Sequence, residues 1–274
     1  MNIYEMPAVF TSMPISGLAL VTCIAIYFTS AILAGLSGFG FSAFGALSIC
    51  FLPPEFAVSM LMSVSLVTQI YSFRAMLSAT TRLATQQLEP VLLIKKMVPY
   101  TIGGIGGLYV GIGLLTVFSA EVICVILGAF LSIYAAYCLM KPIGLQSTLG
   151  SSPRWSGVIG FLSTMIGAFC GGPGIVLMAW FQLCAVPKDV ARRMVQPFII
   201  LMQSIGLTMF ILKSPSVFSA SFFVSIAILL PIALLGSEVG VRIYTKTSEF
   251  NYRKIVTFLL LGSGITLILK AAMD

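Results

Sequence analysis

Histidine is absent from all 274 residues of this chain. Imidazole is the commonest general base and a frequent zinc ligand, so its absence excludes His-assisted nucleophiles, imidazole proton relays and the usual zinc sites. The sequence also lacks the GxxxxGKS/T loop that binds nucleotide phosphates, which argues against ATP hydrolysis by the chain itself. We therefore expect no enzymatic activity, no metal site and no cofactor.

Charged residues are scarce, at 8%, whereas 59% of residues are apolar and the mean hydropathy is +1.08. Such a composition is typical of a polytopic membrane protein. The six cysteines are scattered, mostly within apolar runs, without a pair at metal-ligand spacing, so we interpret them as small buried side chains. The first ten residues contain Glu5 and no basic residue, and we expect no cleaved signal peptide.

An internal duplication is visible at an offset of 134 positions, which separates Gly38 from Gly172. The same offset pairs further glycines, prolines and glutamines along the chain, among them Gln69 with Gln203. Such coincidences in one register indicate a repeat. We expect one transmembrane domain over 1–274, with repeat 1 at 12–140 and repeat 2 at 146–271.

Apolar segments divide each half into five parts. They run over 14–36, 40–52, 55–73, 91–116 and 120–140, and then over 157–170, 174–186, 189–212, 216–239 and 254–271. The second segment of each half is near 20 Å long as a helix, too short to cross a hydrocarbon core of about 30 Å. These segments are therefore expected to be broken or re-entrant helices.

The basic residues orient the array, because cytoplasmic loops carry the excess of Lys and Arg. With the loop near residues 74–96 inside, alternation places 13 of the 15 basic residues inside, and only Lys213 and Lys270 outside. This basic cytoplasmic side accounts for the net charge of +7 without a nucleic-acid partner. Both termini are then external, and an odd number of segments in each half makes the repeats inverted. We predict an all-α polytopic membrane protein with two inverted repeats, glycine-tipped short helices and 8–10 membrane segments, an architecture typical of secondary transporters.

Glycine clusters precede the short second segment of each half. A turn of this kind frees backbone amides at the positive end of a helix, which suits an anion. The alternative is that the glycines only let helices approach closely. The candidate anion-binding residues from these clusters are Ser37, Gly38, Gly40, Gly171, Gly172 and Gly174.

Two glutamines and an arginine complete the candidate site. Helical rise from Pro187 places Gln203 at nearly the depth of the second glycine cluster, and the same spacing places Gln69 beside Gly40. A buried glutamine amide either joins helices or binds substrate, and both interpretations stay open. Arg192 is expected near the cytoplasmic mouth, either to capture anions or to anchor the helix at the headgroups.

Carboxylates are few, and none of them falls clearly at mid-membrane. Glu238, close to the end of the segment 216–239, is the least peripheral. Proton coupling is therefore left open by the sequence.

These stretches resemble the sulfite exporter TauE/SafE family, also called the 4-toluene sulfonate uptake permease family. The second half carries most of the resemblance through Gly171-Gly172-Pro173-Gly174, Val186-Pro187-Lys188-Asp189 with Arg192, and Gly236 to Arg242. The first half is similar over Gly35 to Gly40 and at Pro53-Pro54, but departs from the glycine-richer pattern of many members at Ser42 to Leu47.

The resemblance implies a secondary transporter that moves sulfur-containing anions, such as sulfite, sulfoacetate or other organosulfonates, across the bacterial inner membrane by alternating access. A passive anion channel is the alternative, and an intramembrane enzyme or assembly factor is a third class. The expected partners are a small sulfur-containing anion and membrane lipids, with a coupling proton or other ion and a second copy of the chain as further candidates.

Overall fold

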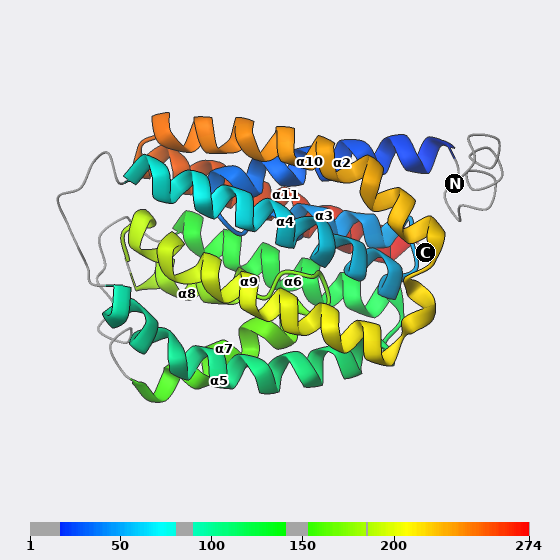
Figure 1. Ribbon diagram of the computed structural model, residues 1–274, viewed down its shortest axis with the longest axis horizontal. Coiled ribbons are helices and arrows are strands. Elements are labelled where there is room, and N and C mark those ends of the chain that lie inside the picture. The colour runs from blue at the N-terminus through cyan, green and yellow to red at the C-terminus, as the bar shows by residue number, and fades with distance from the viewer. Residues whose placement is uncertain (1–16, 81–89, 141–152, 185, 274) are drawn as a thin grey trace.

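The computed structural model describes residues 17–80, 90–140, 153–184 and 186–273, and within these ranges every regular element is a helix (Figure 1). The first repeat holds α2 (Gly17–Ser37), α3 (Gly40–Gly45), the 3₁₀ helix η2 (Ala46–Cys50), α4 (Pro54–Thr80), α5 (Pro90–Leu115) and α6 (Ala120–Met140). The second holds α7 (Pro153–Gly167), α8 (Ile175–Leu183), α9 (Lys188–Lys213), the 3₁₀ helix η5 (Pro215–Val217), α10 (Ala220–Lys246) and α11 (Glu249–Met273). The expected all-α class is confirmed.

Within the described ranges, five apolar spans are long enough to cross a membrane, which confirms the polytopic architecture. They are Pro54–Ala75, Lys95–Leu115, Ala120–Tyr137, Asp189–Lys213 and Ala220–Lys246. Proline marks several helix starts: Pro54, Pro90 and Pro153 are first helical residues, where a missing N–H costs no hydrogen bond.

Two helices extend seven residues beyond their apolar segments, α4 to Thr80 and α10 to Lys246. The segment over 216–239 was bounded by hydropathy and stopped before Arg242, whereas α10 continues to Lys246. Helical hydrogen bonding does not stop at a charged residue, and a lysine near a helix C-terminus stabilises the helix by interacting with its dipole. Glu238 therefore lies well inside α10 and not close to its end.

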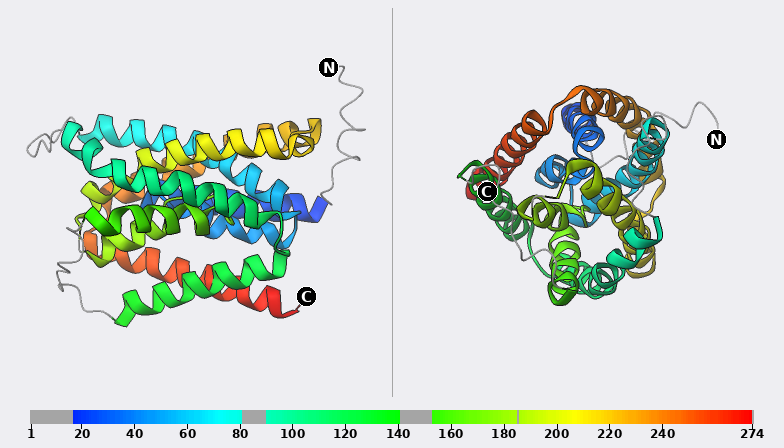
Figure 2. Two further views of the ribbon diagram at one scale, coloured as in Figure 1. Left: turned by 90° about the horizontal axis from the view of Figure 1, so that it is seen from below. Right: turned by 90° about the vertical axis from the view of Figure 1, so that its left-hand side faces the viewer.

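Both short segments form hairpins that return to the end of the molecule from which they came. The chain reverses at Gly38, with φ 80°, and at Gly171, with φ 66°, a backbone region that glycine adopts without strain. The α2–α3 pair starts and finishes at one end of the bundle, and the α7–α8 pair at the opposite end (Figure 1). In the end view, α3 and α8 lie toward the middle, enclosed by longer helices (Figure 2).

The two repeats exchange helices in the tertiary packing. The most extensive contacts join α5 to α7, α2 to α10, and α6 to α11, so that each pair combines one helix from either repeat. Glycines allow the first of these approaches: a Cβ on Gly103 would lie 1.9 Å from the carbonyl oxygen of Gly157. At the centre α4 contacts α9. Two inverted copies of one unit would pair in this way, but the division into repeats stays a prediction, and its boundaries at 12 and 146 fall outside the described residues.

The basic residues gather at one end of the bundle. Within the described ranges they lie where α4 and α10 end and where α5, α7, α9 and α11 begin, except for Lys213 and Lys270 near the opposite helix ends. Arg82 and Lys141 lie outside the described residues. The start of α2 and the end of α11 share the other end (Figure 1). Which end faces the cytoplasm stays a prediction.

Candidate functional site

The first hairpin tip satisfies its own amides in this conformation. The Ser37 hydroxyl oxygen accepts hydrogen bonds from the N–H groups of Gly40, at 2.8 Å, and Phe39, at 3.3 Å. The same hydroxyl donates to the carbonyl oxygen of Leu33, at 2.6 Å. The amides that were expected to face an anion therefore face Ser37 here.

The second tip is held by different groups. The N–H of Gly172 donates to the carbonyl of Gly167 at 2.8 Å, and the hydroxyl of Ser163 donates to the carbonyl of Pro173 at 2.6 Å. The tips of the two hairpins approach each other, since a Cβ on Gly172 would lie 2.4 Å from the Cβ of Ser42 in α3. Gly174 is also enclosed, with the side chain of Ile199 on α9 against it.

The two glutamines of the repeat take matching positions. Gln69 Nε2 on α4 donates to the carbonyl oxygen of Gly38 at 2.8 Å, and Gln203 Nε2 on α9 donates to the carbonyl oxygen of Gly171 at 2.8 Å. Gln203 Nε2 also donates to Ser65 Oγ at 2.9 Å. Each glutamine thus ties the left-handed glycine of its own hairpin to a central helix.

Arg192 lies beside the first tip and is buried, with 1% of its surface exposed. One terminal nitrogen donates to the carbonyl of Gly35 at 2.8 Å and to Ser72 Oγ at 2.7 Å, while the other approaches the carbonyl of Leu36 at 3.5 Å. These carbonyls belong to the last turn of α2, the negative end of its helix dipole, which attracts a cation. Arg192 was expected at a solvent-accessible mouth or at the headgroups; it lies instead inside the protein.

Gln196 and Ser72 join this site, although the sequence did not single them out. Gln196 Nε2 donates to Gln69 Oε1 at 3.1 Å and to Ser72 Oγ at 3.3 Å. Together with Arg192 they form what we call the Arg192 cluster, which consists of the side chains of Gln69, Ser72, Arg192 and Gln196 and the carbonyls of Gly35, Leu36 and Gly38. The spacing of Gln196 from Arg192, four residues apart on α9, was a signal that both lie on one helix face.

An aromatic side chain covers the cluster from α10. The Tyr244 ring centroid lies 4.3 Å from the guanidinium carbon of Arg192, and its hydroxyl donates to the carboxylate of Asp189. A guanidinium over an aromatic face is stabilised by the ring quadrupole. Four helices, α2, α4, α9 and α10, thus converge on one buried guanidinium.

Three of the four side chains in the cluster have no polar counterpart across the repeat; Gln69 is the exception, since it pairs with Gln203. The offset of 134 pairs Arg192 with Val58, Gln196 with Met62 and Ser72 with Gly206. Val58 and Met62 are fully buried, and a Cβ on Gly206 would lie 2.9 Å from the Met62 side chain. The arrangement is therefore polar beside the first hairpin tip and apolar at the equivalent positions of the other repeat.

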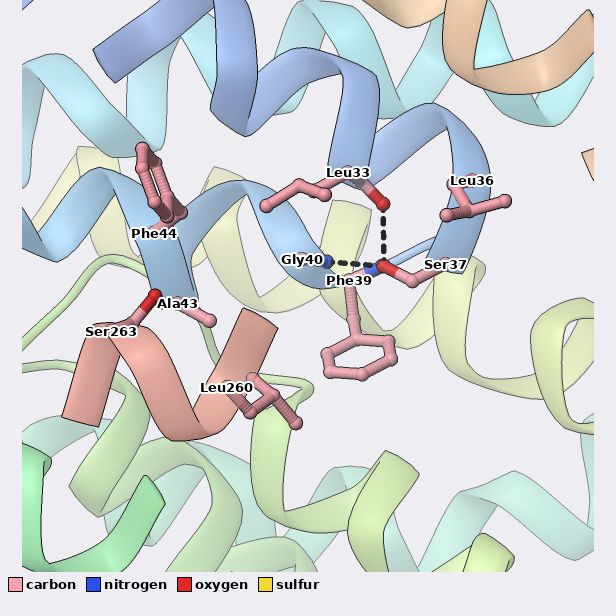
Figure 3. Close-up of a pocket in the computed structure, with 9 residues that line it drawn as sticks. All are labelled: Leu33, Leu36, Ser37, Phe39, Gly40, Ala43, Phe44, Leu260 and Ser263. Atoms are coloured by element: carbon pink, nitrogen blue, oxygen red, sulfur yellow. Dashed lines mark hydrogen bonds between the residues drawn. The ribbon is translucent and has the colours of Figure 1, made fainter. Parts of the chain in front are cut away.

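A small hollow lies between the first hairpin and α11 (Figure 3). Leu33, Phe39, Phe44 and Leu260 contribute apolar side chains to its lining, which does not suit an anion. Within the described part of the chain, no group of three or more Cys, Asp or Glu side chains lies close enough together to hold a metal ion.

Buried donors from two helices are what the site offers chemically. Arg192 supplies a planar charged fork, and the amides of Gln69 and Gln196 lie next to it. Charge-assisted bonds from such a fork are the strong ones, and they match the oxygens of a carboxylate, phosphate or sulfonate.

Comparison with known proteins found one family. The model described as "Sulfite exporter TauE/SafE" matches residues 23–267 of the chain. No curated protein and no solved structure matches it.

Proposed function

This chain belongs to the sulfite exporter TauE/SafE family, and from that premise we propose that it is a secondary transporter of sulfur-containing anions working by alternating access. Sulfite, sulfoacetate and other organosulfonates are the candidate substrates. Membership of this family and the apolar helices support a membrane transporter at the coarser level.

The Arg192 cluster is the observation that carries the substrate class. A sulfonate or sulfite presents oxygens in a compact trigonal group, and a guanidinium can donate to two of them at once. Arg192 holds two acceptors with one nitrogen, the carbonyl of Gly35 and Ser72 Oγ. An anion oxygen would compete with the neutral carbonyl for this donor, because charge makes it the stronger acceptor.

In this proposal, the two hairpins are the elements that move during transport. Each tip is tied to a central helix through one glutamine amide, Gln69 or Gln203, so a limited set of hydrogen bonds holds it in place. If an anion draws Arg192 away from the last turn of α2, the first hairpin loses part of that attachment. The access of the site to either side would then change with occupancy, as alternating access requires.

Exchange transport is the experiment that tests the proposal. Purified protein in liposomes preloaded with unlabelled sulfite, sulfoacetate or taurine is presented with the same labelled anion outside. We expect saturable counterflow with at least one of these anions and little with acetate, which lacks the sulfur oxyanion group. Flux that rises linearly with concentration and shows no counterflow would favour the passive anion channel and contradict the carrier.

A further inference from the structure

One carboxylate is placed unlike the other described ones. Glu55, Glu121 and Asp189 lie in the first turns of their helices, and α11 begins at Glu249. Glu238 lies eight residues before the last residue of α10, so about 12 Å of helix separates it from that end. A helix of about 40 Å that is centred on a hydrocarbon core of about 30 Å would place Glu238 inside that core. An ionisable side chain at such depth is costly and is usually functional.

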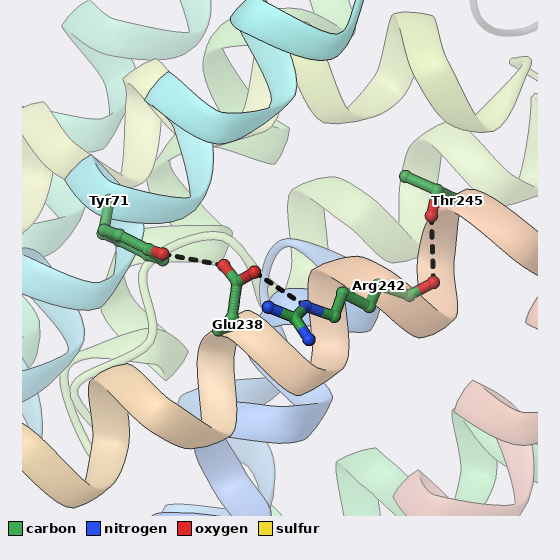
Figure 4. A network of polar contacts seen from close by, with 4 residues as sticks. All are labelled: Tyr71, Glu238, Arg242 and Thr245. Atoms are coloured by element: carbon green, nitrogen blue, oxygen red, sulfur yellow. Dashed lines mark hydrogen bonds and ion pairs between the residues drawn. The ribbon is translucent and has the colours of Figure 1, made fainter.

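Both oxygens of this carboxylate are engaged. Tyr71 on α4 donates its hydroxyl to Glu238 Oε2 at 2.7 Å, and Arg242, one turn further along α10, donates Nε to Oε1 at 2.8 Å (Figure 4). The Glu238 side chain is 35% exposed at the surface of the helix bundle. The carboxylate thus links α10 to α4 while a neighbouring cation offsets its charge.

The hydrogen bond between Tyr71 and Glu238 lies close to the Arg192 cluster on two helices, α4 and α2. Ser72, which bonds to Arg192, is the residue after the tyrosine partner of Glu238 on α4. On its other side, α10 packs closely on α2, where a Cβ on Gly35 would lie 2.9 Å from the Cα of Gly240. The carbonyl of Gly35 is the other acceptor of the same arginine nitrogen. Both helices that α10 joins therefore carry acceptors of Arg192.

We propose that Glu238 is the proton-coupling residue of this chain, an inference that rests on the transport function proposed above. Uptake of one proton converts the carboxylate to a neutral acid and forms one O–H bond. The loss of charge weakens the bonds from Tyr71 and Arg242, which frees α10 to move relative to α4. Release of the proton on the opposite side restores the link, so one proton moves in each transport cycle.

Near Glu238, α4 and α2 offer few other titratable groups for proton coupling. Arg74 lies three residues beyond Tyr71 on α4 and is exposed. The described part of α2 contains Cys23 and Tyr27 as its titratable groups, and both lie more than two turns before Gly35, which faces α10. The groups in contact with the carboxylate are thus Tyr71 and Arg242, and Arg74 lies about one turn beyond Tyr71 on α4.

Glu238→Gln separates coupling from binding, because glutamine keeps the shape and can still accept from Tyr71. The labelled anion that gives counterflow (sulfite, sulfoacetate or taurine) is added outside liposomes that contain the protein and a trapped pH dye. A pH gradient is then imposed, and the dye follows proton movement. In the wild type we expect accumulation above equilibrium with proton flux. In E238Q we expect counterflow within about twofold of the wild type, with accumulation and proton flux lost. Glu121→Gln, at a helix start, is the matched control and should behave as the wild type.

Glu238→Asp keeps a carboxyl group and should retain accumulation with a displaced pH optimum. Accumulation by E238Q equal to that of the wild type would overturn the coupling role, as would wild-type accumulation that does not change with the imposed pH gradient. Loss of both counterflow and accumulation in E238D would assign Glu238 a purely structural role and also overturn the inference. Absence of counterflow in the wild type itself would instead overturn the proposed transport function.

Discussion

A single buried arginine distinguishes the two halves of this duplicated chain. Under the repeat, Arg192 corresponds to Val58 and Gln196 to Met62, so the guanidinium and its amide neighbour exist on one side only. A buried cation needs several acceptors, and the last turn of α2 with Ser72 provides them. The proposed anion site is therefore centred on the first hairpin and not midway between equal glycine tips.

Arg192→Lys should weaken substrate binding although it keeps the charge. Lysine cannot reproduce a planar fork, and a hydrogen bond to a charged group contributes about 1.5–3 kcal/mol, so we expect roughly ten- to hundredfold weaker affinity. Calorimetry with the anion that shows counterflow measures the change, on protein checked for a single thermal transition.

The neighbouring residue provides the control. Arg193, on the same turn of α9, is only partly buried and is not one of the residues of the Arg192 cluster, so Arg193→Lys should leave affinity unchanged. Equal losses in both variants would indicate a general electrostatic effect, and no loss in R192K would remove Arg192 from the site.

At the scale of elements, local sequence places the chain reversal of each hairpin to within one residue. The offset of 134 positions pairs Gly38 with Gly172. In the structure, however, the glycine with positive φ in the second hairpin is Gly171. Gly171-Gly172-Pro173 allows the reversal to occur one position earlier, because either glycine can take the positive φ. Glycine content thus predicted the reversal but not its register.

The glycines of α5 differ in how closely they pack against α7. A Cβ on Gly103 would lie 1.9 Å from the Gly157 carbonyl oxygen, whereas a Cβ on Gly113 would meet nothing within 4 Å. Gly103→Ala must push α5 and α7 apart, and overpacking of this kind costs about 1–3 kcal/mol. We expect a lower thermal midpoint in detergent for G103A and an unchanged or slightly higher one for Gly113→Ala, since alanine favours a helix. Similar midpoints for the two variants would argue against this pairing.

At the scale of the whole molecule, the exchange of helices between repeats makes the two halves depend on each other. α5 packs on α7 and α10 packs on α2, so each hairpin is supported mainly by a helix of the other repeat. A shift of one hairpin therefore passes to the opposite half. This is the physical basis for linking Glu238 on α10 to the first hairpin tip.

Labelling from each side of the membrane tests the predicted orientation. In a variant whose native cysteines are replaced, single cysteines at Ser119 and Ser216 should react with an impermeant reagent from the periplasm. A cysteine at Thr247, at the basic end of the bundle, should react only after the membrane is opened. Thr247 reacting from the periplasm would reverse the orientation. If the cysteines introduced at Ser119 and Ser216 reacted from opposite sides of the membrane, the fold would be contradicted.

The sequence by itself determined the membrane class, the pattern of duplication, the helices to within seven residues of their ends, and the depth at which Gln69 and Gln203 meet the glycine turns. Apolar run length, glycine and proline positions and helical rise are local properties, so they can be followed along the chain. The role of these residues in binding stays a prediction.

Only the tertiary structure decided that Arg192 is buried against the end of α2, that Gln196 and Ser72 share its site, and that Glu238 faces Tyr71. Each of these contacts depends on how a helix is rotated about its axis and on which distant helix it packs against. Long-range pairing of that kind arises from the fit of whole helix surfaces, which apolar periodicity in so uniformly hydrophobic a chain does not specify.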